Sequence, residues 1–392
     1  MNIANLYSLA SGQRLNRIHV FEKYYPIPFD KYIIIQPWSK PSKNFSYWND
    51  VLTLLFPILD KNGIKIIQCG QKNEPGLNYC YHTQGLTSFG QLEFLISKSQ
   101  LVLTSDSVSS HLSGHYNIPL VVLISNNFKN CISPYFGDKT KQIILEPDRT
   151  NKNPSFMLDE GPNKQINEIK PEEVARAVCK LLNLEFSYPY KTLYTGPTYV
   201  TRLVETVPNQ IINISNLGLD SIIVRMDFLF DENVLANQLN ICMCSIITNR
   251  PINHQILKTF KPKIREVIYL ITEEHSVEFV KNLQALAIPF VLLTYLPPEK
   301  YTPFKLDYMD LAAIHKKDHL DPQNIEALKF KDLSGLFYKS NKLTLSSGKI
   351  YPSKAAWLKD LPAPDFNLTE FPVIDEFDFW NEAEHFSILT KN

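Results

Sequence analysis

The sequence predicts an α/β protein of two domains, each built on a largely parallel β-sheet. The chain has 392 residues, more than one ordinary domain contains. In both halves, short runs rich in β-branched residues alternate with stretches whose apolar residues recur at helical spacing. Strands separated by helices are typical of parallel sheets. The expected order is an irregular lead-in over 1–30, a first domain over 31–185, a linker over 186–200, a second domain over 201–365 and a closing helix over 366–392.

The first domain is the more regular of the two. YIIIQ is a β-branched run that stops at Pro37, and the helical pattern after it ends at Asn62-Gly63, a good C-terminal stop. Pro171 suits the first turn of the last helix, where Val174 and Val178 belong to one apolar stripe. The predicted strands are 32–36, 64–70, 101–105, 119–125 and 142–147, and the predicted helices are 46–63, 88–99, 107–117 and 170–183.

The second domain repeats the alternation. Its linker, 186–200, is rich in tyrosine and proline and has no helical period. The tail carries Phe379, Trp380 and Phe386 among acidic residues, which predicts an amphipathic helix that closes the fold. The expected elements are apolar runs at 211–215, 221–230 and 237–249, strands at 266–272 and 289–296, helices at 251–261 and 276–288, and a hairpin followed by a short helix within 340–358.

The composition excludes several classes of protein. Lys and Arg number 40, as do Asp and Glu, so the net charge does not indicate a nucleic-acid or membrane surface. Six scattered cysteines form no Cys-x-x-Cys pair, which favours free thiols in a reducing compartment. The first residues lack the apolar core of a signal peptide, and no stretch approaches the length of a membrane span. We expect a cytoplasmic protein without stable membrane insertion; its oligomeric state is open.

The stretch LVLTSDSVSSHLSGHYNIP, at 101–119, contains a polar corner between a strand and a helix. Asp106 or Ser107 at the start of the helix would cap its free backbone N–H groups. The same N–H groups and the helix dipole form a site for an anion. His111 follows five residues after Asp106, and such a histidine is by itself more often a structural helix residue. A simple cap and a phosphate-binding corner are both open on these residues alone.

Other predicted strands also end in polar loops. Lys43 lies in a loop before a tryptophan-bearing helix, and CGQKNEP places Gly70 and Glu74 after the second strand. Thr87 and Ser88 stand at a helix start. Because ligands of open α/β sheets collect at the carboxyl ends of the strands, these loops are consistent with one cleft.

Spacing and order of these motifs over residues 31–183 resemble the nucleotide-sugar-binding half of the ADP-heptose:lipopolysaccharide heptosyltransferase family, a GT-B glycosyltransferase group. The motifs are Lys43 with Trp48, CGQKNE, GLTS followed by Gln91-Leu92, Asp106-Ser107 with His111-Leu112, and Pro119. The resemblance implies two Rossmann-like domains that face a cleft. It also implies a nucleotide-diphosphate sugar as donor. The donor-binding residues it implies are Lys43, Gly70, Glu74, Thr87, Ser88, Asp106, Ser107 and His111.

Two departures from the family pattern matter. Val108 stands where the family has glycine, so the backbone approaches a phosphate less freely, and neighbouring serine hydroxyls are the expected compensation. The donor half comes first here and second in the family. The chain therefore resembles a circular permutant, or else pairs a familiar domain with a different partner.

The resemblance implies that a carboxylate of the other domain takes the proton from the acceptor hydroxyl. SNLGLDSII nominates Asp220, and Asp227 and Glu273 compete with it, although each is more often a surface or capping carboxylate. No D-x-D motif stands at a strand end, in keeping with a metal-independent enzyme that has no cofactor. The expected acceptor is a cell-surface glycan or, if the chain is viral, a hydroxymethylated DNA base. The alternative is a non-catalytic module that binds a nucleotide or sugar.

Overall fold

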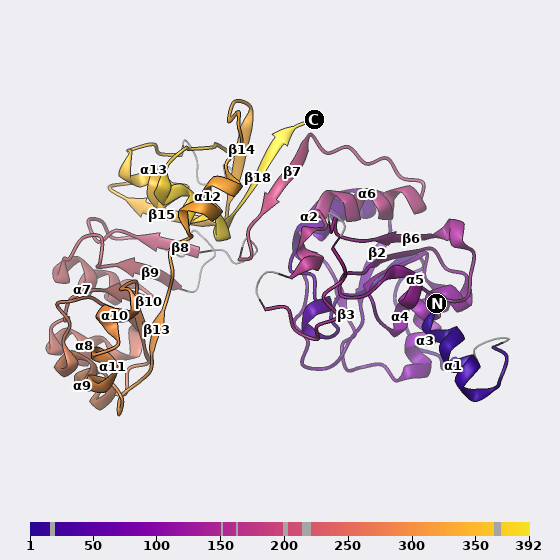
Figure 1. Cartoon of the computed structure of the whole chain (residues 1–392), viewed down its shortest axis with the longest axis horizontal. Coiled ribbons are helices and arrows are strands. Elements are labelled where there is room, and N and C mark those ends of the chain that lie inside the picture. The colour runs from indigo at the N-terminus through magenta and orange to yellow at the C-terminus, as the bar shows by residue number, and fades with distance from the viewer. Residues whose placement is uncertain (16–19, 150–151, 162–163, 199–202, 214–220, 364–369) are drawn as a thin grey trace. The chain divides into compact units, whose positions relative to one another are not determined.

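The computed structural model describes all residues except 16–19, 150–151, 162–163, 199–202, 214–220 and 364–369 (Figure 1). The chain divides into unit 1, residues 1–200 with Asn392, and unit 2, residues 201–391. Each unit has its own hydrophobic core, so each meets a basic requirement of a separate domain. The predicted α/β fold class is confirmed.

Unit 1 is built on a six-stranded parallel sheet in the order β3-β2-β1-β4-β5-β6. The direction in which successive strands are added reverses between β1 and β4, as it does in doubly wound Rossmann-like sheets. The strands are β1 (Tyr32–Gln36), β2 (Lys65–Gln68), β3 (Tyr81–His82), β4 (Leu101–Ser105), β5 (Leu120–Leu123) and β6 (Gln142–Leu145).

Helices cover both faces of this sheet. Side chains alternate along β1, so that Ile33 and Ile35 pack in a core with α2 and α6, whereas Ile34 packs in a second core with α3 and α4. A strand buried on both faces reads as a continuous apolar run, as YIIIQ does. The other elements of unit 1 are α1 (Ile3–Ser11), η1 (Pro41–Lys43), α2 (Trp48–Lys61), α3 (Phe89–Lys98), α4 (Val108–Tyr116), α5 (Lys129–Ile132), η2 (Lys139–Lys141), η3 (Gln165–Glu168), α6 (Pro171–Leu181) and β7 (Tyr190–Thr195).

Unit 2 contains an eight-stranded sheet in the order β13-β12-β11-β10-β9-β8-β15-β16. From β8 to β13 each new strand is added on the same side and in parallel, β15 joins β8 in parallel on the other side, and β16 is antiparallel. The strands are β8 (Leu203–Thr206), β9 (Ser221–Arg225), β10 (Met243–Thr248), β11 (Ile264–Ile271), β12 (Phe290–Thr294), β13 (Ile314–Lys316), β15 (Lys342–Ser346) and β16 (Lys349–Tyr351).

A small antiparallel arrangement completes unit 2, in which β14 pairs with both β17 and β18. These strands are β14 (Leu336–Ser340), β17 (Phe371–Pro372) and β18 (Phe386–Lys391). The helices of unit 2 are α7 (Glu232–Ile241), α8 (His254–Phe260), η5 (Lys261–Lys263), α9 (Val277–Ala285), α10 (Pro298–Tyr301), α11 (Phe304–Asp307), α12 (Pro322–Leu328), α13 (Lys354–Leu358), α14 (Phe377–Asn381) and η6 (Ala383–His385).

Three expectations about the elements were wrong. The lead-in contains the helix α1, and the expected linker contains the strand β7. The apolar run 237–249 is the end of α7 followed by β10. The tail is not one closing helix: its described residues contain α14 and the short η6, and FSILTK forms β18, because Phe386 and Ile388 are buried beside β14.

Candidate functional site

The candidate site of unit 1 lies at the carboxyl ends of β1 and β4, where the strand order reverses. Crevices at such switch points are where open α/β sheets bind their ligands. A cavity of about 530 Å³ opens here. It is lined by Gln36, Trp38, Ser39, Lys40, Asn44, Gln71, Asn73, Glu74, Pro75, Ser107 and Val108.

The N-terminus of α4 faces this cavity without a side-chain cap. Ser107 is the N-cap residue, but it makes no capping hydrogen bond to any described residue. Its Oγ lies instead 2.8 Å from Oγ1 of Thr104 and donates to Oε1 of Gln36 at 3.2 Å. The first N–H groups of α4 therefore receive no side-chain oxygen from their cap, which leaves them able to bind an anion.

Asp106 does not cap α4 either, because it holds Lys43. The Lys43 ammonium, at the end of η1, forms an ion pair with the Asp106 carboxylate, and both side chains are largely buried. Ser39, which lines the cavity, donates from Oγ to the Asp106 carbonyl at 3.3 Å. The interpretation of this corner as a simple cap is wrong: the pair lies directly behind the cavity wall.

His111 lies on α4, one turn beyond Ser107. Burial lowers the pKa of its imidazole, Asp106 raises it and Lys43 lowers it further. The net shift is downward from 6.5, so His111 is predominantly neutral at pH 7. The charges of Asp106 and Lys43 act on this imidazole, which agrees with the predicted grouping of the three residues.

Glu74 lines the cavity in the loop that follows β2, and Gly70 lies in the same loop, outside the lining residues. A Cβ atom on Gly70 would overlap the Glu74 carboxylate, so glycine is needed here to seat that carboxylate. Burial raises the pKa of Glu74, against a backbone hydrogen bond at Gln71 that lowers it. Its Oε2 is buried and has no hydrogen-bond partner among the described residues, so it is able to accept a hydrogen bond.

Thr87 and Ser88 are positioned at α3. Ser88 is the N-cap residue of this helix in a capping box with Gln91, whose Oε1 accepts from the Ser88 N–H at 2.9 Å. Neither Thr87 nor Ser88 belongs to the residues that line the cavity. The capping box therefore gives Ser88 a structural role.

The cavity also contains residues outside the predicted donor-binding set. Gln36 ends β1, and Trp38 follows it, with its indole N–H bonded to the Pro75 carbonyl at 3.0 Å. Lys40 is exposed at the rim. The signal that could have found them was their position directly after a predicted parallel strand, at the edge where ligands bind.

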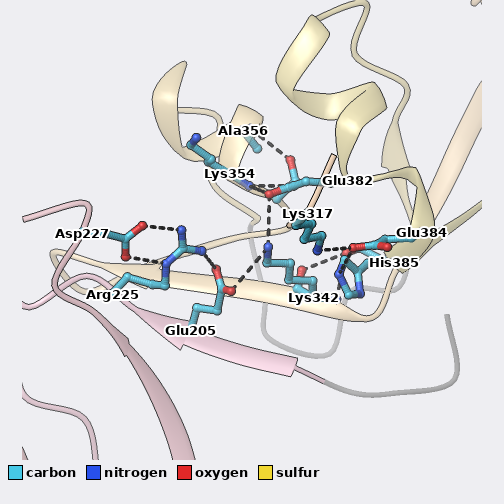
Figure 2. A network of polar contacts seen from close by, with 12 residues as sticks. Glu205, Arg225, Asp227, Lys317, Lys342, Lys354, Ala356, Glu382, Glu384 and His385 are labelled. Carbon is cyan, nitrogen blue, oxygen red and sulfur yellow. Dashed lines mark hydrogen bonds and ion pairs between the residues drawn. The ribbon is translucent and has the colours of Figure 1, made fainter. Parts of the chain in front are cut away.

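In unit 2, the candidate bases differ in their surroundings. Asp220 lies outside the described residues. Both oxygens of Asp227 accept hydrogen bonds from the Arg225 guanidinium, at 2.8 and 2.7 Å (Figure 2). Glu273 is exposed and pairs with Lys300 at 2.6 Å, an interaction that lowers the pKa of the carboxyl. Both described candidates are thus already engaged by a cation.

Asp227 belongs to a chain of buried charges (Figure 2). Arg225 also donates to Glu205 at 2.9 Å, and Lys342 lies within 3.4 Å of Glu205 and 3.3 Å of Glu382. Burial raises the pKa of Glu205, but Lys342 and Arg225 outweigh it, so the net shift is downward.

A second, smaller cavity lies at the carboxyl ends of β9 to β12. It measures about 270 Å³ and combines a carboxylate, an amide, a hydroxyl and an aromatic ring, which are groups suited to a polar ligand. The lining residues are Asp227, Asn249, Leu270, Ile271, Thr272, Tyr295, Leu296 and Pro297.

In the described ranges, no group of three or more His, Cys, Asp or Glu side chains could hold a metal ion. None of the helices in the described part of the chain combines the length and apolar composition required to cross a bilayer.

No protein-family model and no curated protein matches the chain. Among solved structures, the ADP-heptose lipopolysaccharide heptosyltransferase II of E. coli is 18% identical over 40% of this chain and 48% of its own, with a TM-score of 0.32. A family 9 glycosyl transferase from Veillonella parvula is 18% identical over 46% and 50%, with a TM-score of 0.32. The E. coli heptosyltransferase WaaC with ADP is 13% identical over 39% and 44%, with a TM-score of 0.30. The chain thus spans about half the length of the structures it matches, and the expected resemblance is found over less than half of the chain.

Proposed function

We propose that the chain is a glycosyltransferase whose unit 1 binds a nucleotide-diphosphate sugar. The observation that carries the proposal is the uncapped N-terminus of α4 at the strand-order switch, beside the lysines Lys40 and Lys43. Backbone N–H groups, the helix dipole and an ammonium together stabilise a diphosphate.

The rest of the cavity suits the nucleoside. The Trp38 indole offers an aromatic surface against which a base stacks. Glu74, with its unpartnered buried oxygen, accepts a hydrogen bond from a ribose hydroxyl. The hydroxyls of Ser107 and Ser109 both donate to Oε1 of Gln36, so they would have to turn from it to the diphosphate to compensate for Val108.

Transfer requires an acceptor and a base. The acceptor oxygen bonds to the anomeric carbon, the bond from that carbon to the diphosphate breaks, and a carboxylate of unit 2 takes the hydroxyl proton. Asp227, in the strand-end cavity of unit 2, is our candidate for this base, and it needs one oxygen released by Arg225. We propose a glycan hydroxyl as acceptor, no metal or cofactor, and a permuted order of the two halves.

The ion pairs formed by the two candidate bases favour a second function. Arg225 occupies both oxygens of Asp227, and Lys300 pairs with Glu273, so a module that binds the nucleotide sugar without transferring the sugar is the competing candidate. Release of free nucleoside diphosphate with an acceptor panel separates the two. The panel contains sugar hydroxyls and hydroxymethylated DNA.

Donor binding is tested by thermal unfolding with ADP-, UDP-, GDP- and CDP-linked sugars. A ligand at 100 times its Kd adds roughly 2.7 kcal/mol to the free energy of unfolding. Lys40→Gln removes a rim charge without touching the buried pair, and Lys43→Met with Asp106→Asn removes that pair without leaving a lone buried carboxylate. Both variants should have a lower affinity for the nucleotide sugar that stabilises the unchanged protein.

The matched control is Lys65→Gln. Lys65 begins β2, at the opposite edge of the sheet, and pairs with Asp60 on the surface. The Lys65→Gln variant should bind the nucleotide with unchanged affinity. If no nucleotide raises the unfolding temperature, or if Lys65→Gln lowers affinity as much as Lys40→Gln, the donor site is not where we propose.

A further inference from the structure

The N-terminal helix α1 turns its apolar side to solvent. On a helical wheel, one side of α1 is apolar and the other polar. In a helix packed on a protein core the apolar side is covered, but α1 has no buried residue. The exposed fractions of the apolar side chains are 41% for Ile3, 52% for Leu6, 69% for Tyr7 and 69% for Leu9.

The polar side of α1 is the one that is partly covered. Asn2, Asn5 and Ser8 are half-buried. The Asn2 amide donates to the Ser133 carbonyl at 2.9 Å, and its Oδ1 accepts from the Ala4 N–H at 3.0 Å. The hydrogen bond from Asn2 to Ser133 thus links the start of the helix to the rest of unit 1, and the apolar side chains remain exposed.

The helix is well terminated for a segment of only nine residues. Asn2 caps its N-terminus, and Gly12 ends it in the left-handed conformation at φ 67°, which favours glycine. Figure 1 shows α1 at the outside of its unit. Exposed apolar side chains that lie together on one side of a helix are typical of interaction sites.

The charges around α1 are basic. Residues 1–15 contain Arg14 and neither Asp nor Glu. Asn2 borders a cavity that Lys129 and Lys139 also line. The segment 129–146 holds three lysines against Asp138 and Glu146, so its net charge is +1 although Lys129 contacts Glu146 at 3.2 Å.

We propose that α1 docks unit 1 on a lipid surface that contains anionic lipid, with Ile3, Leu6, Tyr7 and Leu9 entering the interface. A second copy of the chain fits less well. A helix of nine residues is roughly 14 Å long, too short to supply the roughly 800 Å² per partner of a stable interface. Two copies would also bring like charges together, whereas anionic headgroups neutralise them.

The test is sedimentation of the full chain with vesicles of phosphatidylcholine, with and without phosphatidylglycerol. We expect binding that is stronger with phosphatidylglycerol, by roughly fivefold for each basic residue involved. Leu6→Ser with Leu9→Ser should lower binding at least tenfold and leave the unfolding temperature unchanged, because both side chains are exposed. Arg14→Gln with Lys141→Gln should remove part of the preference for phosphatidylglycerol.

The matched control is Leu306→Ser with Met309→Ser in unit 2, where the two side chains are 74% and 73% exposed. This control should sediment like the unchanged protein. Absence of sedimentation, an equal loss in the control, or a concentration-dependent doubling of mass in solution that Leu6→Ser with Leu9→Ser abolishes would each overturn the proposal. The last result would identify α1 as a contact between copies.

Discussion

Arg225 binds both carboxylate oxygens of Asp227, with Nε 2.8 Å from Oδ1 and a terminal nitrogen 2.7 Å from Oδ2. The same guanidinium donates to Glu205 at 2.9 Å. A planar fork of this kind fixes two carboxylates at once, and neither oxygen of Asp227 is left without a hydrogen bond. Arg225 thus holds two carboxylates of unit 2 together. Asp227 can accept a proton only if one of its oxygens is released by Arg225.

Arg225→Met should lower the free energy of unfolding by about 3–5 kcal/mol at neutral pH, because it leaves Glu205 and Asp227 buried without their shared cation. The measurement is urea unfolding of the full chain. Lys300→Met is the matched control, since it also removes a cation paired with a carboxylate, but on the surface. Its unfolding midpoint should stay in place, and an equal loss would show that burial is not the cause.

Binding of the nucleotide-diphosphate sugar should tighten as the pH is lowered through about 6.5. In the free protein the pKa of His111 lies below 6.5, chiefly through burial, and a nearby diphosphate raises it. Binding then takes up a proton, so affinity rises as pH falls, by roughly two- to tenfold. The sugar-linked diphosphate has no proton of its own to exchange in this range.

Isothermal titration from pH 7.5 to about 5.5, spanning the ordinary pKa of histidine, measures this dependence. His111→Gln should abolish it, whereas His115→Gln, on the same helix α4, should keep it. A dependence that survives in His111→Gln belongs to another group and would contradict the assignment.

Gly70→Ala should weaken nucleotide binding by roughly tenfold, the effect of losing one hydrogen bond to a buried group. The added Cβ displaces the Glu74 carboxylate, so the effect passes through that residue. Glu74→Ala should cost a similar factor. The double variant should then be no worse than Glu74→Ala, because two changes that act through one group are not additive. Additive losses would show that Gly70 acts through something else.

The sequence predicted much of unit 1 because its signals are local. A β-branched run bounded by Pro37 indicated β1, whose observed bounds match the predicted ones, and the Asp106-Ser107 corner fell between β4 and α4 as expected. β3 was missed because two residues carry no periodic pattern. α1 was missed because nine residues carry only a short helical pattern, although Asn2 and Gly12 are a start and a stop signal.

The interior of the site could not be predicted in the same way. Gln36 accepts hydrogen bonds from serines about seventy residues later, and Lys342 contacts a glutamate on β8. Such contacts depend on strand order, which places β4 beside β1 and β15 beside β8. The family resemblance implied that Lys43, Asp106 and His111 belong to one site, but it did not predict that Asp106 holds Lys43 and leaves α4 without a side-chain cap.

Acid should destabilise unit 2 through Glu384. A hydrogen bond from His385 and the ammonium of Lys317, 2.8 Å away, lower the pKa of this carboxyl to about 2, against burial, which raises it (Figure 2). Because the pKa is depressed in the folded state, the stabilisation is complete above the unfolded value of about 4.5. It is lost as the pH falls from there towards 2, and amounts to about 1 kcal/mol after allowance for solvent screening.

Glu384→Gln should therefore destabilise the chain at pH 7 by about that amount, and the difference should shrink as the pH falls from about 4.5 through 2, because the carboxyl becomes protonated in both states only below its folded pKa. Urea unfolding of both proteins across this range gives the difference directly. Glu326→Gln, which alters an exposed carboxylate paired with Lys329, is the control and should follow the unchanged protein at every pH. A difference between Glu384→Gln and the unchanged protein that does not vary with pH would mean that the side chain stabilises unit 2 by packing, and not through its charge.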